Sequence, residues 1–186
     1  MDQVDYSRHG LIREEESVLV VIEMQEKLFP AMAEKEKLLE NVLRLVKFAQ
    51  ILGLPVMVTE MEKLGNTLPQ LMSELKDIQP IVRPEFNCFG SQVFSSRIKE
   101  LERGVLILAG IEAHICVAQT ALYAVPAYRV HVVSDATSSR SLENRRVALE
   151  RMAQGGVTIS STEMVMYELL ENSGREAFKQ ALKLIK

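Results

Sequence analysis

GVLILAGIEAHICVAQTALYAV, residues 104–125, begins with an aliphatic run, passes through a glycine and ends in a helical pattern. The unbroken aliphatic run at 104–110 is typical of a strand that is buried on both faces of a parallel sheet. The residues from Cys116 onward have the apolar spacing of a helix, which places this cysteine in the first helical turn. A strand that leads straight into a helix opens a βα unit, so the stretch predicts an α/β fold.

The same alternation continues along the whole chain. Further runs with strand character lie at 17–23, 54–60, 128–135 and 156–160. Helices are expected between them, each ending near a glycine that suits a helix C-terminus, at 34–53, 91–104 and 141–156. A weaker strand is expected within 77–84, where Pro80 and Pro84 limit it to a few residues. Because βαβ crossovers place helices on both faces of a sheet, the predicted architecture is a three-layer α/β/α sandwich.

Composition sets limits on the protein class. The chain has 186 residues, of which 47% are hydrophobic and 25% charged, and no linker or repeat divides it, so one globular domain is expected. The net charge is −3 with acids and bases scattered, which disfavours a nucleic-acid partner on electrostatic grounds. Neither a signal-peptide pattern nor an apolar run approaching ~18 residues is found, so we expect a cytoplasmic protein without a membrane partner.

Cysteine and histidine are sparse. Cys88 and Cys116 are the two cysteines, which in a reducing compartment remain thiols. None of the three histidines pairs with a cysteine or carboxylate at metal-ligand spacing, so neither a structural nor a catalytic metal is predicted.

Polar residues that follow the predicted strands are the site candidates, because parallel sheets bind ligands beyond the carboxyl ends of their strands. These candidates are Glu23, Glu60, Arg83, the segment 112–116 and Asp135. We expect three of them to meet in one cleft.

Three of these side chains have chemistry of their own, and each has a structural alternative. Cys116 at a helix N-terminus is expected to have a lowered thiol pKa and act as a nucleophile, although free cysteine is also a common small core residue. Glu23 is either a general base with a burial-raised pKa or one half of an ion pair. Arg83 is the nearest candidate cation, or else a solvated loop residue.

Five motifs, in this order and spacing, identify a family resemblance. They are VVIEMQEKLFP (20–30), PVMVTEMEKLGNT (55–67), RPEFNCFG (83–90), GIEAHICVAQTAL (110–122) and VVSDATSSR (132–140). The sequence resembles the isochorismatase-like cysteine hydrolase superfamily, and within it the isochorismatase-domain-containing proteins. The resemblance runs from about Ser17 to the C-terminus, and residues 1–16 form an N-terminal extension that we expect to be partly ordered.

The resemblance implies a Rossmann-like sandwich with a six-stranded parallel sheet and an Asp, Lys and Cys triad. Cys116 matches the nucleophile, which attacks an amide or related carbonyl carbon without a cofactor. The backbone N–H groups of Glu112 and Cys116 are implied as the oxyanion hole, beside a cis peptide at Ile111 to Glu112. Family members are commonly dimers or larger, so a homo-oligomer is expected.

Both other triad positions depart from the family pattern. Glu23 replaces the Asp, and Arg83 replaces the Lys. Glutamate is longer by a methylene, and arginine holds an anion but does not exchange a proton as lysine does. The leading hypothesis is therefore a cysteine hydrolase of small amides. A binding or scaffold protein that has lost turnover is the alternative, and a ribonuclease, a label that some relatives carry, ranks last because no basic groove is evident.

The pocket is expected to favour a small, partly apolar substrate. Its predicted lining is Gln25, Phe29, Glu60, Phe86 and Phe89, with Met61 and Leu64 beside Glu60. Metal-binding family members carry an Asp and two His after the second strand, and residues 59–71 contain no His. His114, two positions before Cys116, receives no role because side chains at that spacing do not face each other on a helix. Ser141 is predicted to cap a helix.

Overall fold

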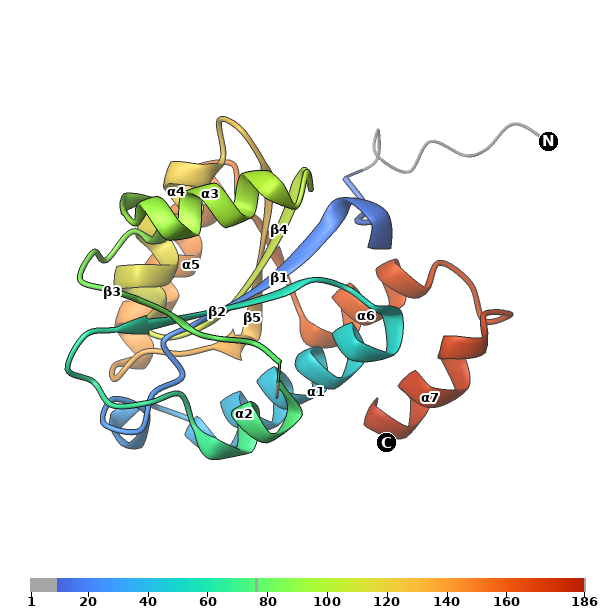
Figure 1. The fold of residues 1–186 in the computed structure, drawn as a ribbon, viewed down its shortest axis with the longest axis horizontal. Coiled ribbons are helices and arrows are strands. Elements are labelled where there is room, and N and C mark those ends of the chain that lie inside the picture. Colours follow the sequence, from blue (N-terminus) through green and yellow to red (C-terminus); the bar gives the residue numbers. More distant parts are fainter. Residues whose placement is uncertain (1–9, 76, 186) are drawn as a thin grey trace.

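The computed structural model describes residues 10–75 and 77–185 and contains a six-stranded parallel sheet (Figure 1). The strand order is β3-β2-β1-β4-β5-β6, and every neighbouring pair is parallel. The strands are β1 (Ser17–Ile22), β2 (Val56–Met61), β3 (Ile81–Arg83), β4 (Val105–Gly110), β5 (Arg129–Thr137) and β6 (Thr158–Ser160). The predicted α/β sandwich and its strand count are confirmed.

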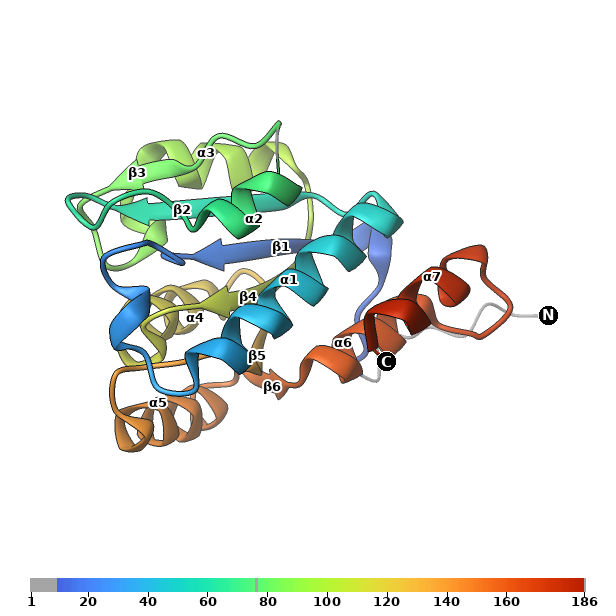
Figure 2. The same ribbon diagram turned by 90° about the horizontal axis from the view of Figure 1, so that it is seen from below.

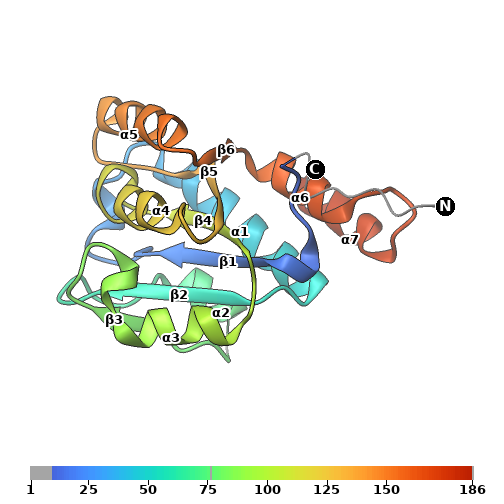
Figure 3. The same ribbon diagram turned by 90° about the horizontal axis from the view of Figure 1, so that it is seen from above.

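Helices cover both faces of this sheet. One face carries α1 (Lys35–Leu52), α2 (Pro69–Glu74), α6 (Thr162–Leu170) and α7 (Glu176–Ile185) (Figure 2). The other carries α3 (Gln92–Glu100), α4 (Ala118–Ala124) and α5 (Leu142–Gln154) (Figure 3). Short turns complete the chain: η2 (Glu14–Glu16), η3 (Phe29–Ala31), η4 (Cys88–Gly90) and the π-helical η5 (Ala113–Val117). None of the described helices is both long and apolar enough to cross a membrane.

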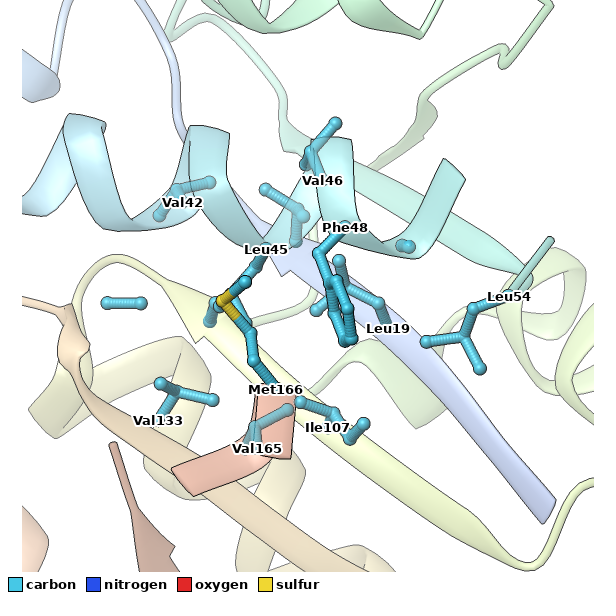
Figure 4. Close-up of a cluster of buried hydrophobic side chains, with 14 of the residues drawn as sticks. Leu19, Val42, Leu45, Val46, Phe48, Leu54, Ile107, Val133, Val165 and Met166 are labelled. Carbon is cyan, nitrogen blue, oxygen red and sulfur yellow. The ribbon is translucent and has the colours of Figure 1, made fainter. Parts of the chain in front are cut away.

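The central strands β1 and β4 are aliphatic throughout because they contribute to both cores. All six residues of each strand are buried. Leu19 on β1 and Ile107 on β4 face the core under α1 and α6, where they pack with Phe48 and Met166 (Figure 4). Their strand neighbours face the core under α3 to α5. Each fully buried aliphatic side chain contributes about 1.5–3 kcal/mol, so the alternation of facing residues stabilises all three layers at once.

The structure shortens one expected helix, adds one that was not expected and agrees with two other local expectations. The helix expected at 91–104 stops at Glu100, with Leu101 as its C-cap, so Gly104 does not cap it. Helix α2 was not predicted because six residues are too short to display a helical period. Strand β3 has three residues, as its flanking prolines require, and Ser141 caps α5 by accepting a hydrogen bond from the Asn144 N–H.

The described part of the N-terminal extension, residues 10–16, packs against the body. Ile12 is buried in the core under α1, and Arg175 pairs with Glu14 at 2.6 Å. Arg103 also donates to the Glu14 carbonyl at 2.6 Å. Residues 1–9 of the extension lie outside the described residues.

The strand order reverses between β1 and β4. The backbones of these two strands approach each other very closely where the strands end, at Ile22 and Gly110. The Ile111 N–H donates to the Ile22 carbonyl at 2.9 Å. Gly110 has φ +121°, and a Cβ at this residue would lie 2.0 Å from the Ile22 carbonyl oxygen. Only glycine fits, because both the left-handed conformation and the contact exclude a side chain. The carboxyl ends of β1 and β2 lie at the end of the molecule opposite to α6 and α7 (Figure 2).

Replacing Gly110 by alanine is therefore expected to destabilise the fold severely. The clash is with backbone of the neighbouring central strand, so the expected loss is on the order of 4 kcal/mol or more in urea unfolding. Gly104→Ala is the matched control, because nothing lies within 4 Å of the position that a Cβ would take there. Equal stability of the two variants would contradict the conclusion that the close contact between Gly110 and Ile22 requires glycine.

His131 makes the fold sensitive to acid. It is buried on β5, and its Nδ1 has no hydrogen-bond partner among the described residues. Burial, aided by the Arg129 charge, lowers the pKa of His131 from 6.5 to about 4. The unfolded chain binds a proton near 6.5 and the folded chain does not, so stability falls as the pH drops below 6.5.

Between about pH 7 and about pH 5, the protonation of His131 alone should remove about 2 kcal/mol of unfolding free energy. His131→Leu should reduce the difference between urea unfolding free energies at the two pH values by that amount. Other titrating groups are common to both proteins and cancel in this comparison. An unchanged difference in the variant would show that His131 is not the sensitive group.

Candidate active site

Three of the candidate strand-end residues come together beyond the sheet. Glu23 directly follows β1, Arg83 is the last residue of β3, and Cys116 lies in η5 after β4. All three are almost fully buried, with exposures of 1%, 1% and 3%. They lie beside the point at which the strand order reverses, where open parallel sheets bind ligands.

The other two candidates serve the scaffold. Glu60 accepts hydrogen bonds from the backbone N–H and the hydroxyl of Thr67, both at 2.7 Å. Asp135 accepts from the N–H of Thr162 at 2.8 Å and from its hydroxyl at 2.9 Å, at the start of α6.

Glu23 terminates β1 by its backbone conformation. Its φ of +54° is left-handed, which ends the strand at Ile22 while its N–H still donates to the Thr59 carbonyl at 3.0 Å. A non-glycine residue in this region carries a conformational cost, and such residues recur at turns and at active sites. The turn directs the chain out of the sheet at the residue whose carboxylate enters the site.

Cys116 is placed by an unusual turn between β4 and α4. The peptide between Ile111 and Glu112 is cis, at the position that the family resemblance implied. Residues 113–117 then form a π-helical turn, in which the N–H groups of Ile115 and Val117 both donate to the Glu112 carbonyl. The expected position of Cys116 at a helix start is observed, with a wider π turn in place of an α turn.

The Glu23 carboxylate contacts both other residues. Arg83 Nη2 donates to Glu23 Oε1 at 2.6 Å and lies 3.4 Å from the Thr59 hydroxyl. The same carboxylate also lies near the Cys116 thiol, close enough for each of these two groups to shift the pKa of the other. The ion pair and the contact with sulfur therefore coexist. The Nε and Nη1 groups of Arg83 have no partner among the described residues.

The pKa of the Cys116 thiol is raised, so the expectation of a lowered value is wrong. Burial is the main cause, and the neighbouring Glu23 carboxylate adds to it, while Arg83 acts in the opposite direction. Burial also raises the pKa of Glu23, opposed by its hydrogen bond to Cys116 and by Arg83. The helix N-terminus does not dominate here, because a thiolate would be desolvated and face a carboxylate.

The raised pKa of Cys116 keeps the proton on sulfur, while the Glu23 carboxylate pairs with Arg83. With a carboxylate and a thiol, the charge of Arg83 is balanced. With a carboxylic acid and a thiolate it is balanced equally. Proton transfer between the two groups leaves the net charge of this buried cluster unchanged, so it avoids the cost of burying an uncompensated charge.

Cys88 lies in the core beneath the site. Its N–H donates to the Thr120 hydroxyl at 3.0 Å, its sulfur lies 3.9 Å from Thr59 Oγ1, and its side chain has no exposed surface. Burial raises the pKa of this thiol as well. These contacts are those of a small core residue.

A cavity of about 210 Å³ is lined in part by Glu23 and Cys116. Its walls are Glu23, Leu28, Met61, Leu64, Phe86, Glu112, Ile115, Cys116 and Arg140. Phe86 lines it as predicted, together with Met61 and Leu64. The walls are mostly apolar, and their ionic side chains are Glu23, Glu112 and Arg140.

Four residues predicted to line the pocket do not line this cavity. Gln25 ties the chain after β1 to the loop after β2, because its amide bonds to the backbone of Met61 and to the Gly65 carbonyl. Glu60 is occupied by Thr67, as described above. Phe29 packs against the core under α1, and the Phe89 ring packs 5.1 Å from that of Phe94 and 5.4 Å from that of Tyr123. Both aromatics belong to the packing of the protein.

Glu112 and Arg140 are wall residues that the sequence reasoning assigned no side-chain role. The Glu112 side chain, 3% exposed, accepts hydrogen bonds from the Arg140 backbone N–H at 3.1 Å and from its Nε at 2.9 Å. His114 Nδ1 lies 3.0 Å from the Ser139 hydroxyl and 3.7 Å from Glu112. Glu112 and Arg140 each lie in one of the five family motifs, and this was the feature of the sequence that could have marked them as site residues.

No group of three or more metal-ligating side chains is arranged around a possible ion site in the part of the chain that the structure describes.

Comparison with known proteins places the chain in a family. The isochorismatase domain model matches residues 17–164. The secreted isochorismatase effector Isc1 of Phytophthora sojae is 35% identical over 96% of this chain and 89% of its own length. Isochorismatase domain-containing protein 2 of Danio rerio is 35% identical over 95% of this chain and 90% of its own length.

Solved structures agree with this assignment. A structure described as the MAR1 ribonuclease of Caenorhabditis elegans has a TM-score of 0.89 and 32% identity, covering 94% of this chain and 92% of that one. The YcaC gene product of Escherichia coli, described as an octameric hydrolase of unknown specificity, has a TM-score of 0.88 and 26% identity, covering 94% and 89%. With the buried cysteine at the sheet reversal, these matches show that the chain belongs to the isochorismatase-domain family.

Proposed function

We propose that this protein is a cofactor-free cysteine hydrolase of small amides or related carbonyl compounds. The observation that carries the proposal is the position of the Glu23 carboxylate, which pairs with the Arg83 guanidinium and lies beside the Cys116 thiol. A nucleophile, a base and an orienting group in mutual contact are the arrangement that nucleophilic catalysis requires. The hydrolase-like fold and the cavity above the sulfur add support.

In the first half of the reaction, the thiol proton passes to Glu23 as the sulfur attacks the carbonyl carbon. The raised pKa of Glu23 makes it a stronger base than an ordinary carboxylate. The tetrahedral intermediate collapses when the C–N bond breaks, and the proton on Glu23 moves to the departing nitrogen. Ammonia or an amine leaves, and a thioester on Cys116 remains.

In the second half, a water molecule attacks the thioester carbon while Glu23 accepts one of its protons. The C–S bond then breaks, the proton returns to sulfur, and the carboxylic acid leaves. The backbone N–H groups of Glu112 and Cys116 are proposed to stabilise the oxyanion in both halves. Arg83 stays protonated throughout and orients Glu23, because arginine does not release its proton.

A binding protein that has lost turnover is the rival, and one contact favours it. Arg83 and Glu23 form a short, buried ion pair at 2.6 Å, and a cation at this distance weakens a carboxylate base. The proximity of Glu23 to the Cys116 thiol favours the enzyme, because a general base must lie beside the group whose proton it accepts.

The ribonuclease named among the relatives suggests a further activity. The cavity of about 210 Å³ has mostly apolar walls and a single cation among the described residues that line it, whereas binding of RNA uses stacking surfaces and a basic groove. We therefore rank RNA cleavage last, and salt-sensitive RNA binding would be its signature.

Self-association also belongs to the proposal, in line with the octameric relative from Escherichia coli. A cytoplasmic location remains a prediction, and one relative is described as secreted.

The unaltered protein should hydrolyse members of a panel of small amides, as followed by release of ammonia. Cys116→Ala should lower turnover at least about a thousandfold, because the covalent route is lost. Cys88→Ala is the matched control, a thiol removed from the core beneath the site, and should keep turnover. Activity that appears only after Glu23→Asp and Arg83→Lys are combined would favour the retired enzyme.

Glu23→Gln should change thiol reactivity and turnover in opposite directions. In the unaltered protein, alkylation of Cys116 should show a rate midpoint above ~8.5, because burial and Glu23 hold the proton on sulfur. Removing the adjacent negative charge leaves Arg83 to favour the thiolate, so the midpoint should fall. Turnover should fall by about 10²–10⁴, since the base is gone.

The measurement is peptide mapping by mass spectrometry after timed alkylation over a pH series, alongside amide turnover. Circular dichroism checks that the variant folds with Arg83 facing a neutral partner. A midpoint that stays in place, or turnover that survives, would contradict the role of Glu23 as base.

A further inference from the structure

Arg140 is the last residue of the DATSSR motif and has no part in the chemistry described above. It lines the same cavity as Cys116, and its side chain is 60% exposed. Among the described residues that line this cavity, Arg140 is the only cation. Its position in the wall of a cavity that Cys116 also lines, with much of its side chain exposed, raises the question of what it binds.

Glu112 holds Arg140 from behind. One carboxylate oxygen accepts from the Arg140 Nε at 2.9 Å, and the other accepts from its backbone N–H at 3.1 Å. The Glu112 side chain is buried, so this anchor is shielded from solvent. The terminal Nη1 and Nη2 groups of Arg140 have no hydrogen-bond partner within the described residues. The guanidinium is therefore fixed at one edge and open at the other.

An open guanidinium edge matches one kind of ligand group. Two parallel N–H donors suit a planar carboxylate, which binds them in a bidentate manner. The other ionic groups of the wall are already paired, Glu23 with Arg83 and Glu112 with Arg140 itself. The remaining wall is apolar, through residues such as Leu28, Leu64 and Ile115, and suits a short hydrocarbon segment.

We propose that Arg140 determines substrate specificity by binding a carboxylate, so that the substrate is a short amide or related carbonyl compound with a carboxylate at its far end. The carbonyl group lies at Cys116, the apolar segment against the aliphatic wall and the carboxylate at Arg140. This inference rests on the proposed function and names its substrate class. Hydrolysis creates a second carboxylate beside Glu23, and repulsion between like charges then favours product release.

Alkylation of Cys116 tests carboxylate binding without requiring turnover. Iodoacetate and iodoacetamide have nearly the same size and differ in charge. The rate ratio of iodoacetate to iodoacetamide at Cys116 should be about tenfold higher in the unaltered protein than in Arg140→Gln, because the guanidinium charge in the cavity wall attracts the anionic reagent. Arg140→Lys, which keeps the charge and loses the fork, should lie between them.

Arg146→Gln is the matched control, because Arg146 is an exposed arginine on α5 that pairs with Glu143 and Glu150 away from the cavity. It should leave the ratio unchanged. Added salt should lower the iodoacetate rate of the unaltered protein and spare the iodoacetamide rate, which tests the idea even if Arg140→Gln fails to fold. An equal ratio in the unaltered protein and Arg140→Gln, or no selective salt effect, overturns the inference.

Succinamate and butyramide then separate this inference from the proposed function, since they differ in one terminal carboxylate. Faster hydrolysis of succinamate, with a preference that falls in Arg140→Gln, supports both. Hydrolysis of butyramide at an equal or higher rate overturns the carboxylate site and leaves the hydrolase standing. If no amide is hydrolysed, including these two, the proposed hydrolase is overturned. The carboxylate site still stands in that case if the alkylation ratio depends on Arg140.

Discussion

The buried ion pair between Glu23 and Arg83 is the interaction on which the site depends. Both side chains are withdrawn from water, and a charge in that position costs several kcal/mol unless an opposite charge lies beside it. The pair connects the ends of β1 and β3, two strands that do not touch in the sheet, with β2 between them. Because the carboxylate also reaches Cys116, the ends of β1, β3 and β4 are held in one constellation by a single side chain.

Charge balance explains how a buried thiol with a raised pKa could still pass its proton to Glu23. A free thiolate would be uncompensated in the apolar surroundings, whereas a proton shared between Cys116 and Glu23 leaves the net charge of the cluster constant. The second pair, Glu112 with Arg140, places a further cation and anion in the wall of the same cavity. One pair therefore faces the sulfur, and the other presents an open guanidinium edge to whatever enters.

The strands were predictable because their burial requires aliphatic runs, and the candidate residues were predictable because parallel strands end at one edge. The residues that line the cavity were harder to predict from the sequence. Phe29 and Phe89 have the same chemistry as Phe86, and only packing decides which ring faces a cavity and which faces the core. The direction of the thiol pKa was missed for a related reason. A helix start is visible in sequence, whereas the degree of burial and the distance to Glu23 are not.

The sequence by itself determined the layered α/β order, the position of Cys116 after a central strand, and the charge signs at positions 23 and 83, because these follow from local pattern and residue type. The tertiary structure decided that the Glu23 carboxylate lies beside both Arg83 and Cys116, that Glu112 orients Arg140, and that Gly110 permits the close approach of the β1 and β4 backbones. These outcomes depend on distances between segments far apart in the chain, which are set by how the helices and strands pack.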